Sequence, residues 1–188
     1  RHLTAFWVAL AVFAAGTSFG GAVIFNDTDA KPALMPFAHL MQDPAKRVAW
    51  EERAQKDRMA GKKSSFASYL ISNNTKVAFL ALSLGITWGA GTFCVVLFNG
   101  IYFGATLADY IQAGQSEFLT AWLLPHGSIE LPAILLAAQA GFLLAGALTG
   151  IGARGRPVSF RLRLRHISKD ILTLMGGVCL MLLWAGFI

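Results

Sequence analysis

The chain has 188 residues, of which 55% are hydrophobic and only 14% charged, with a formal net charge of +6. A single water-soluble core of this length rarely needs so large an apolar fraction, so the composition excludes an ordinary soluble domain and favours a lipid-embedded protein. The basic residues lie beside apolar runs and form no nucleic-acid-binding motif, so we expect no nucleic-acid partner. Anionic lipid headgroups are the partners that we expect for them.

The apolar runs predict an all-α fold, a polytopic transmembrane helical bundle with about five membrane helices, because about 20 apolar residues cross a bilayer. We expect residues 1–188 to form one transmembrane domain. In chain order we assign a helix at 1–25, a long polar and amphipathic loop at 26–73, a helix at 77–98, an irregular region at 100–124, a helix at 128–151, a basic loop at 152–170, and a helix at 171–188 that we expect to continue beyond the last residue.

Small residues recur within the predicted helices. Gly16 and Gly20 lie in the first, Gly85 and Gly89 in the second, and Gly141 in the helix at 128–151. Small residues let helix backbones approach closely in a bilayer, so these faces predict helix packing and self-association into a homo-oligomer.

The long loop at 26–73 contains a charged, helix-favouring stretch at 43–63. Asp43-Pro44 has the pattern of an N-cap followed by proline at the first helical position. The amphipathic residues at 64–70 suit a helix in the headgroup layer. Asn73 and Asn74 could bind a lipid headgroup or cap the helix that follows. We favour the cap, because asparagine accepts hydrogen bonds from free N–H groups at a helix start.

The region at 100–124 is less regular. Residues 101–111 are apolar but cover only about half of the bilayer at roughly 1.5 Å per residue. A polar break at 112–117 and a short apolar piece at 118–124 follow. We expect a short or broken helix after Asn99-Gly100, where the preceding helix ends, and then a re-entrant half-helix that stops at Pro125-His126-Gly127, shielded by protein or lining an aqueous cavity.

Five polar residues punctuate this apolar half of the chain, namely Asn99, Asp109, Glu117, His126 and Glu130. Ionisable groups at membrane depth need a partner or an aqueous path, and His126 and Glu130, four residues apart, can partner each other. The pair has three readings: a polar clamp that locks the turn, an ion- or proton-linked site, or a contact with a partner or lipid. No third metal ligand and no nucleophile arrangement accompanies it, so we expect no metal, no cofactor and no enzymatic activity.

The loop at 152–170 is densely basic. Positive loops face the cytoplasm, so we place this loop and the N terminus inside and the loop at 26–73 outside a cell membrane. For residues 160–165 we expect an interfacial helix or an extended loop. The residues that we expect to bind lipid headgroups are Arg154, Arg156, Arg161, Arg163, Arg165 and Lys169. Cys94 and Cys179 both lie in apolar stretches, where we interpret them as small core or lipid-facing residues.

One segment carries a family resemblance. It reads Leu124-Pro125-His126-Gly127-Ser128-Ile129-Glu130-Leu131-Pro132-Ala133-Ile134, followed by Ala140-Gly141-Phe142. This string resembles the hallmark segment of the stage II sporulation protein M family. That family's other landmarks are matched in the same order by Asn73-Asn74, by Leu84-Gly85-Ile86-Thr87-Trp88-Gly89 and by Asn99-Gly100-Ile101.

The resemblance implies a five-helix integral membrane protein. The family's namesake acts with membrane-anchored peptidoglycan hydrolases during engulfment, as a scaffold that localises them, whereas other relatives occur in organisms that make no spores. By this resemblance we expect a membrane scaffold whose partners are other membrane proteins, cell-wall hydrolases among them. The family assigns no chemistry to His126 or Glu130, and a transporter or channel component remains the alternative.

Overall fold

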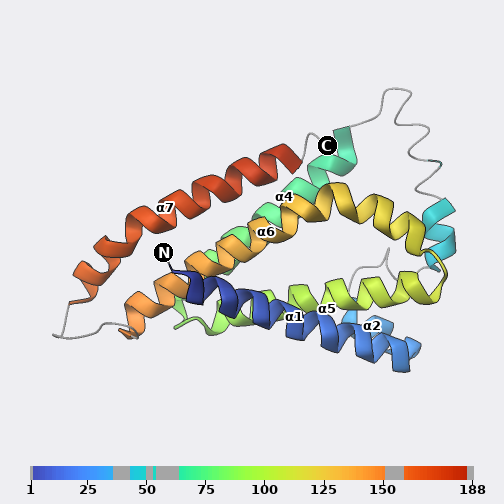
Figure 1. The fold of residues 1–188 in the computed structure, drawn as a ribbon, viewed down its shortest axis with the longest axis horizontal. Helices are drawn as coiled ribbons and strands as arrows, with labels where there is room; N and C mark the ends of the chain where they lie inside the picture. The colour runs from blue at the N-terminus through green and yellow to red at the C-terminus, as the bar shows by residue number, and fades with distance from the viewer. Residues whose placement is uncertain (1, 36–42, 50–52, 54–63, 151–158, 186–188) are drawn as a thin grey trace.

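The computed structural model describes residues 2–35, 43–49, 53, 64–150 and 159–185 (Figure 1). Helices dominate these residues, and no strand occurs among them. In chain order the elements are α1 (Leu3–Asn26), the 3-10 helix η1 (Thr28–Ala30), α2 (Lys31–Leu34), a helical stretch at 44–49, α4 (Ser64–Ser83), the 3-10 helix η3 (Leu84–Ile86), α5 (Ala90–Gln112), α6 (Ser116–Thr149) and α7 (Phe160–Ala185).

Four stretches of the described helices are long and apolar enough to cross a membrane. They are α1, α5, the Gly127–Thr149 part of α6, and α7. The predicted all-α polytopic bundle is therefore confirmed. The fifth long helix, α4, has a polar first half and packs beside α6.

The helices α1 and α5 run in the same direction and lie side by side (Figure 1). Their contact is made of glycines, because Gly16 and Gly20 of α1 face Gly100 and Gly104 of α5. A Cβ added at any of these four glycines would collide with a backbone carbonyl oxygen of the other helix. The predicted close packing through Gly16 and Gly20 is thus confirmed, and both glycines are used inside the protomer.

The helix predicted at 77–98 is wrong, because the chain reverses between Ser83 and Ala90. α4 ends at Ser83, η3 follows, and Gly89 precedes α5 with φ of 87°. Only glycine adopts such a left-handed conformation without strain. The Thr87 hydroxyl donates to the Leu84 carbonyl at 2.7 Å and accepts from the Gly91 N–H at 2.8 Å, so side-chain hydrogen bonds replace the helical ones.

The short helix and re-entrant piece predicted at 100–124 are also wrong. α5 passes through Asn99-Gly100 without a break and ends at Gln112. After a turn in which Gly114 has φ of 69°, α6 runs for 34 residues with Pro125 and Pro132 inside it. Pro125 leaves the Ala121 carbonyl without its helical N–H partner, and Pro132 does the same to the Ser128 carbonyl. A membrane helix tolerates proline where other groups satisfy such carbonyls. The Ser128 hydroxyl donates to the Pro125 carbonyl at 3.2 Å, within the same stretch. Figure 1 shows that α6 bends along its length.

α4 and α6 also run in the same direction, and α7 returns along α6. A Cβ on Gly85 of η3 would collide with the Gly141 carbonyl of α6, and a Cβ on Gly141 would collide with the Ala81 carbonyl of α4. The shared core is built mainly from small side chains of these helices. Its fully buried alanines include Ala78, Ala81, Ala133, Ala137, Ala138 and Ala140.

α7 begins at Phe160, so the basic loop predicted at 152–170 is too long and the last helix starts before the predicted residue 171. Residues 160–165 form its first turns, which confirms the helical alternative for them. Their alternating pattern of arginines and apolar residues fits helix as well as strand over so short a run. The rest of the predicted loop, 152–158, lies outside the described residues.

Candidate functional site

The most buried charged cluster surrounds Asp109 on the last turns of α5. Its side chain is 4% exposed and forms ion pairs with Lys31 of α2 and with Arg47 of the 44–49 helix. The Arg47 Nη2 atom lies 2.5 Å from the Asp109 Oδ2 atom, and the guanidinium carbon lies 4.7 Å from the centre of the Tyr110 ring. A buried carboxylate is stable only when it is paired and hydrogen-bonded, so Asp109 ties two loop segments to the bundle. We call Lys31, Arg47 and Asp109 the Asp109 clamp.

Local sequence positions both cations of the clamp. The Asp43 side chain accepts a hydrogen bond from the Ala45 N–H at 2.8 Å, which confirms the predicted N-cap of the helix that carries Arg47. The Asp27 side chain accepts from the Asp29 N–H at 2.9 Å and opens η1, directly before Lys31. Met35 then packs with Ile24, Ala105 and Ala108. Caps and a small apolar cluster therefore hold the loop against the end of α5 together with the ion pairs.

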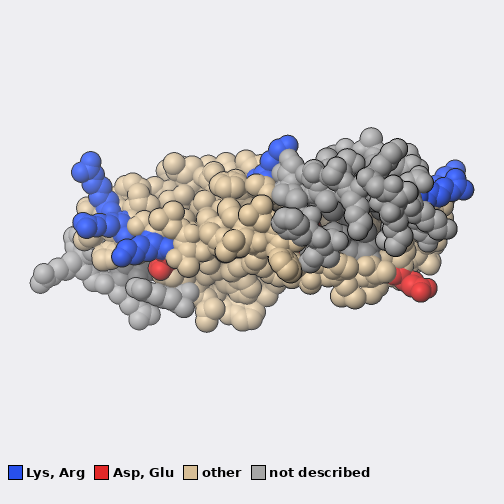
Figure 2. Space-filling model, turned by 90° about the horizontal axis from the view of Figure 1, so that it is seen from above, with Lys and Arg blue, Asp and Glu red and all other residues tan. Residues whose placement is uncertain are grey.

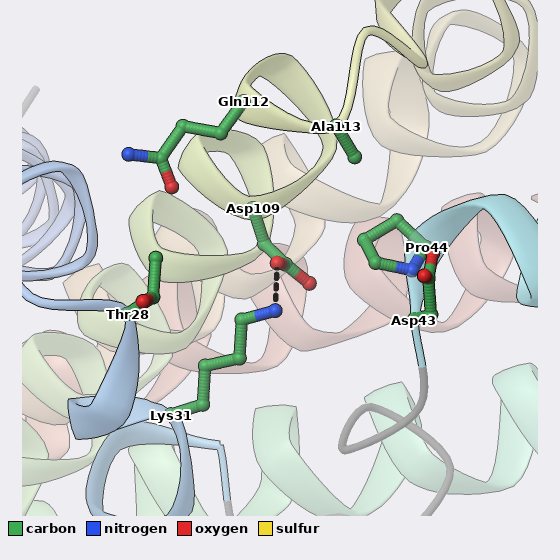
Figure 3. A pocket seen from close by; sticks show the side chains of 7 residues that line it. All are labelled: Thr28, Lys31, Asp43, Pro44, Asp109, Gln112 and Ala113. Atoms are coloured by element: carbon green, nitrogen blue, oxygen red, sulfur yellow. Dashed lines mark ion pairs between the residues drawn. The ribbon is translucent and has the colours of Figure 1, made fainter.

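An open hollow of about 400 Å³ lies beside the clamp. Figure 3 shows the Lys31 ammonium reaching the Asp109 carboxylate, with Asp43 and Pro44 across the hollow. Thr28, Gln112 and Ala113 complete its lining. Its walls combine two carboxylates, an ammonium, a hydroxyl and an amide with the apolar Pro44 and Ala113, so the lining is mixed and carries one more acidic than basic group.

A second polar contact joins α4 to α6. The Asn74 side-chain amide donates to a carboxylate oxygen of Glu130 at 2.7 Å, and the Asn73 amide lies 3.5 Å from the Asn74 oxygen. Asn73 and Asn74 lie inside α4, so the prediction that they cap a helix start is wrong. The structure thus joins two predicted site residues, Asn74 and Glu130, and the partner of the carboxylate comes from another helix.

The remaining predicted motif residues lie within helices. Pro125, Gly127 and Pro132 belong to α6, with Gly127 buried against Leu123 and Leu131. The helix is continuous here, so the predicted Pro125-His126-Gly127 turn is wrong. The backbone of His126 belongs to α6, but its side chain is not described, so the predicted pairing of His126 with Glu130 stays a prediction.

Asn99 and Gly100 have separate structural roles in the middle of α5. The Asn99 amide donates to the Val95 carbonyl at 2.7 Å, one turn back in the same helix. Gly100 is buried against Phe13 and Thr17 of α1. The prediction that this pair ends a helix is wrong, because the glycine serves the crossing with α1.

Four of the six predicted lipid-binding cations lie among the described residues. Arg154 and Arg156 lie outside the described residues. Arg161, Arg165 and Lys169 are exposed on α7, whereas Arg163 is half-buried and approaches the Leu148 carbonyl at 3.5 Å, at the end of α6. In Figure 2 basic side chains gather over the start of α7, and the described surface next to them is mostly tan.

A polar junction near the chain start was not predicted. The His2 imidazole lies 2.8 Å from the Asp170 carboxylate of α7, and Gln139 of α6 donates to the His2 carbonyl at 3.1 Å. Lys31 and Arg47 were also missed as site residues. The signal that could have found them is Asp109 itself, because a carboxylate in an apolar stretch requires cations and the 26–73 loop supplies eight of them. Within the described part of the chain, no three His, Cys, Asp or Glu residues are grouped to hold a metal ion.

Apolar helices packed through small residues, with a charged loop clamped to one end of the bundle, define a polytopic helical membrane protein. The sequence model of the Stage II sporulation protein M family matches residues 6–188, and the chain belongs to that family. An uncharacterised protein of Methanocaldococcus jannaschii is 37% identical over 81 residues, which cover 43% of this chain and 46% of that relative. No solved structure matches the chain.

Proposed function

We propose that this protein is a non-enzymatic membrane scaffold that holds partner membrane proteins through the segment between α1 and α4. The observation that carries the proposal is the Asp109 clamp, because it fixes residues 27–35 and 43–49 against the bundle by a buried carboxylate and two cations. A free linker needs no such attachment. Asp27, Asp29 and Lys46 remain exposed on this segment, so a charged surface of defined shape is available to a partner.

The experiment is co-purification from membranes of the organism that encodes the protein. A companion membrane protein, cell-wall hydrolases being the leading class by family membership, is expected with the wild type and lost when residues 26–73 are replaced by a flexible linker. Asp109→Asn should weaken the association and the exposed Glu117→Gln variant should not. A wild-type protein that purifies alone under mild detergent contradicts the scaffold.

The proposed topology places the N terminus and residues 152–170 in the cytoplasm and residues 26–73 outside. Arg161, Arg165 and Lys169 support it, because short basic segments face the cytoplasm. The direction of the helices agrees, since α1 and α5 run together and α6 runs back.

We also propose self-association through α7, whose span has the smallest buried share among the four apolar helices. A methyl group added at Gly176 or Gly177 would meet no described heavy atom within 4 Å, unlike one added at the glycines of the α1–α5 crossing. Oxidation of membranes should therefore cross-link copies through exposed Cys179 in a Cys94→Ser background. A monomer under oxidation, with Cys179 reactive to maleimide, contradicts this interface.

Transport is a second candidate because of the Asn74–Glu130 contact. Glu130 is a half-buried carboxylate in an apolar helix between two prolines, and intramembrane carboxylates occur in ion and proton paths. An ion or proton flux into liposomes that contain the wild-type protein, abolished by Glu130→Gln, would support this candidate. Equal flux in wild-type and variant liposomes removes it.

A further inference from the structure

The turn between α4 and α5 presents two large apolar side chains that no described contact covers. Ile86 is 64% exposed and Trp88 is 74% exposed, the largest exposed fraction among the large hydrophobic residues described. We propose that this turn is an interfacial anchor, in which Trp88 and Ile86 insert into the lipid headgroup boundary on the side of the basic start of α7.

The backbone of Trp88 gives the first argument. Its φ is 55°, in the left-handed region that bulky residues rarely adopt. Non-glycine residues in that region persist where the surrounding structure holds them, and such positions cluster at binding sites and other functional positions. Here the conformation directs an indole ring outward, where nothing described in the protein covers it.

The turn is rigid enough to hold the indole at one depth. The Gly85 backbone lies against Gly141, and Gly89 lies against Ala145 and Phe142. Backbone bonds run from Thr87 N to Leu84 O at 3.1 Å and from Gly89 N to Gly85 O at 3.2 Å. Because these polar groups are satisfied internally, the turn can leave bulk water at little cost.

The position of the turn identifies lipid as the occupant. Gly89 packs on Ala145, one turn before the end of α6, and Arg163 reaches Leu148 at that same end. The turn is therefore level with the start of α7, where Arg161, Arg165 and Lys169 are exposed. Tryptophan is enriched at membrane–water interfaces, and arginine and lysine beside it attract anionic headgroups.

Spin-label depth measurements test the anchor in the full chain, with Cys94 and Cys179 replaced by serine. Labels at Trp88→Cys and Ile86→Cys are compared with Phe98→Cys in the middle of α5 and Arg165→Cys on α7, in phosphatidylcholine vesicles containing phosphatidylglycerol. The collision ratio of oxygen to a water-soluble nickel chelate should be high at residue 98, low at 165 and intermediate at 86 and 88. A ratio at 88 equal to that at 165 overturns the anchor, and shielding from both reagents overturns it in favour of a protein partner.

A second variant separates anchoring from folding. Trp88→Gly relieves the left-handed strain, so thermal unfolding in detergent should be unchanged or shifted upward. In vesicles the label at residue 86 should move toward the value at 165, while the matched Trp7→Ala variant, which removes another exposed tryptophan, should leave it in place. An unmoved label at residue 86 in Trp88→Gly also overturns the proposal.

Discussion

The two parallel helix pairs of this protein, α1 with α5 and α4 with α6, are packed by different means. Along the first crossing, four glycines bring backbone against backbone, and the hydrogen bond from the Gln112 side chain to the Phe25 carbonyl lies at its far end. The second crossing has one such glycine, Gly141 of α6 against the Ala81 carbonyl of α4, and adds the Asn74–Glu130 hydrogen bond.

The difference shows that steric fit and polar contacts both stabilise this membrane bundle, in different proportions in the two helix pairs. Lipid is as apolar as leucine, so helices gain little from apolar burial alone and depend on close packing. The α1–α5 pair depends on it along the whole crossing. The α4–α6 pair adds a hydrogen bond between two side chains inside the bundle, because Asn74 of α4 lies opposite Glu130 of α6.

We expect the largest effect from a substitution that disrupts the glycine contact between α1 and α5. Gly104→Val places a branched side chain against the Thr17 carbonyl oxygen and requires α1 and α5 to separate. We expect a loss of more than about 3 kcal/mol of stability, the upper range for overpacking, seen as no folded protein in a thermal unfolding assay in detergent. Gly176→Ala is the control, since open space surrounds Gly176, and it should be neutral or stabilising. A stable Gly104→Val protein would contradict the crossing.

The next effect concerns the end of α5, where the ion pairs of Asp109, and not a glycine contact, hold the loop against the helix. Asp109→Asn leaves Lys31 and Arg47 without their carboxylate, and removal of one partner from a buried ion pair costs about 3 to 5 kcal/mol. Because these contacts hold the loop, limited proteolysis should cut at residues 27–49 while α1 and α5 remain paired. The triple variant Lys31→Met, Arg47→Met, Asp109→Leu should regain protection. Unchanged proteolysis in Asp109→Asn rules out the clamp.

A smaller effect sharpens the polar side of the comparison. Asn74→Leu removes the donor to Glu130 and should cost about 1 kcal/mol, because interhelical hydrogen bonds in membranes average about 0.6 kcal/mol. Glu130→Gln keeps an acceptor oxygen and should cost less. Unfolding midpoints of the two variants, measured side by side in one detergent, check the order. If Asn74→Leu lowered the stability as much as Gly104→Val, the proposed difference between the two helix pairs would be wrong.

The smallest effect concerns the junction of α1 with α7. The side chains of His2 and Asp170 are 27% and 31% exposed, and ion pairs with solvent access contribute about 0 to 1 kcal/mol. Asp170→Asn should therefore shift the unfolding midpoint only slightly. A loss comparable to that of Asp109→Asn would place the junction among the main contacts of the bundle.

The sequence predicts α1 and the all-α bundle well because hydropathy reports length and burial. It could not predict the turn at Ser83–Ala90, since the apolar run is continuous and the break depends on Gly89 and the Thr87 hydroxyl. From hydropathy we also predict a break at Pro125, but this residue lies inside α6. Proline inside a membrane helix is tolerated when other groups satisfy the freed carbonyls.

The site was predicted less completely than the fold. Asn74 and Glu130 were both selected, but their pairing depends on how α4 lies beside α6, which no local pattern encodes. Asp109 was recognised as a polar residue in an apolar region. Its cations could not be chosen among the eight in the 26–73 loop, because the caps at Asp27 and Asp43 and the packing of Met35 decide which of them reach it.

The most direct test of the account labels the two ends of the bundle from one side of the membrane. In a Cys94→Ser, Cys179→Ser background, Lys46→Cys lies on the clamped loop and Arg165→Cys on the start of α7. We predict that a membrane-impermeant maleimide labels residue 46 in intact cells and residue 165 only after permeabilisation. Labelling of both residues from the same side would contradict the proposed membrane crossings and the scaffold built on them.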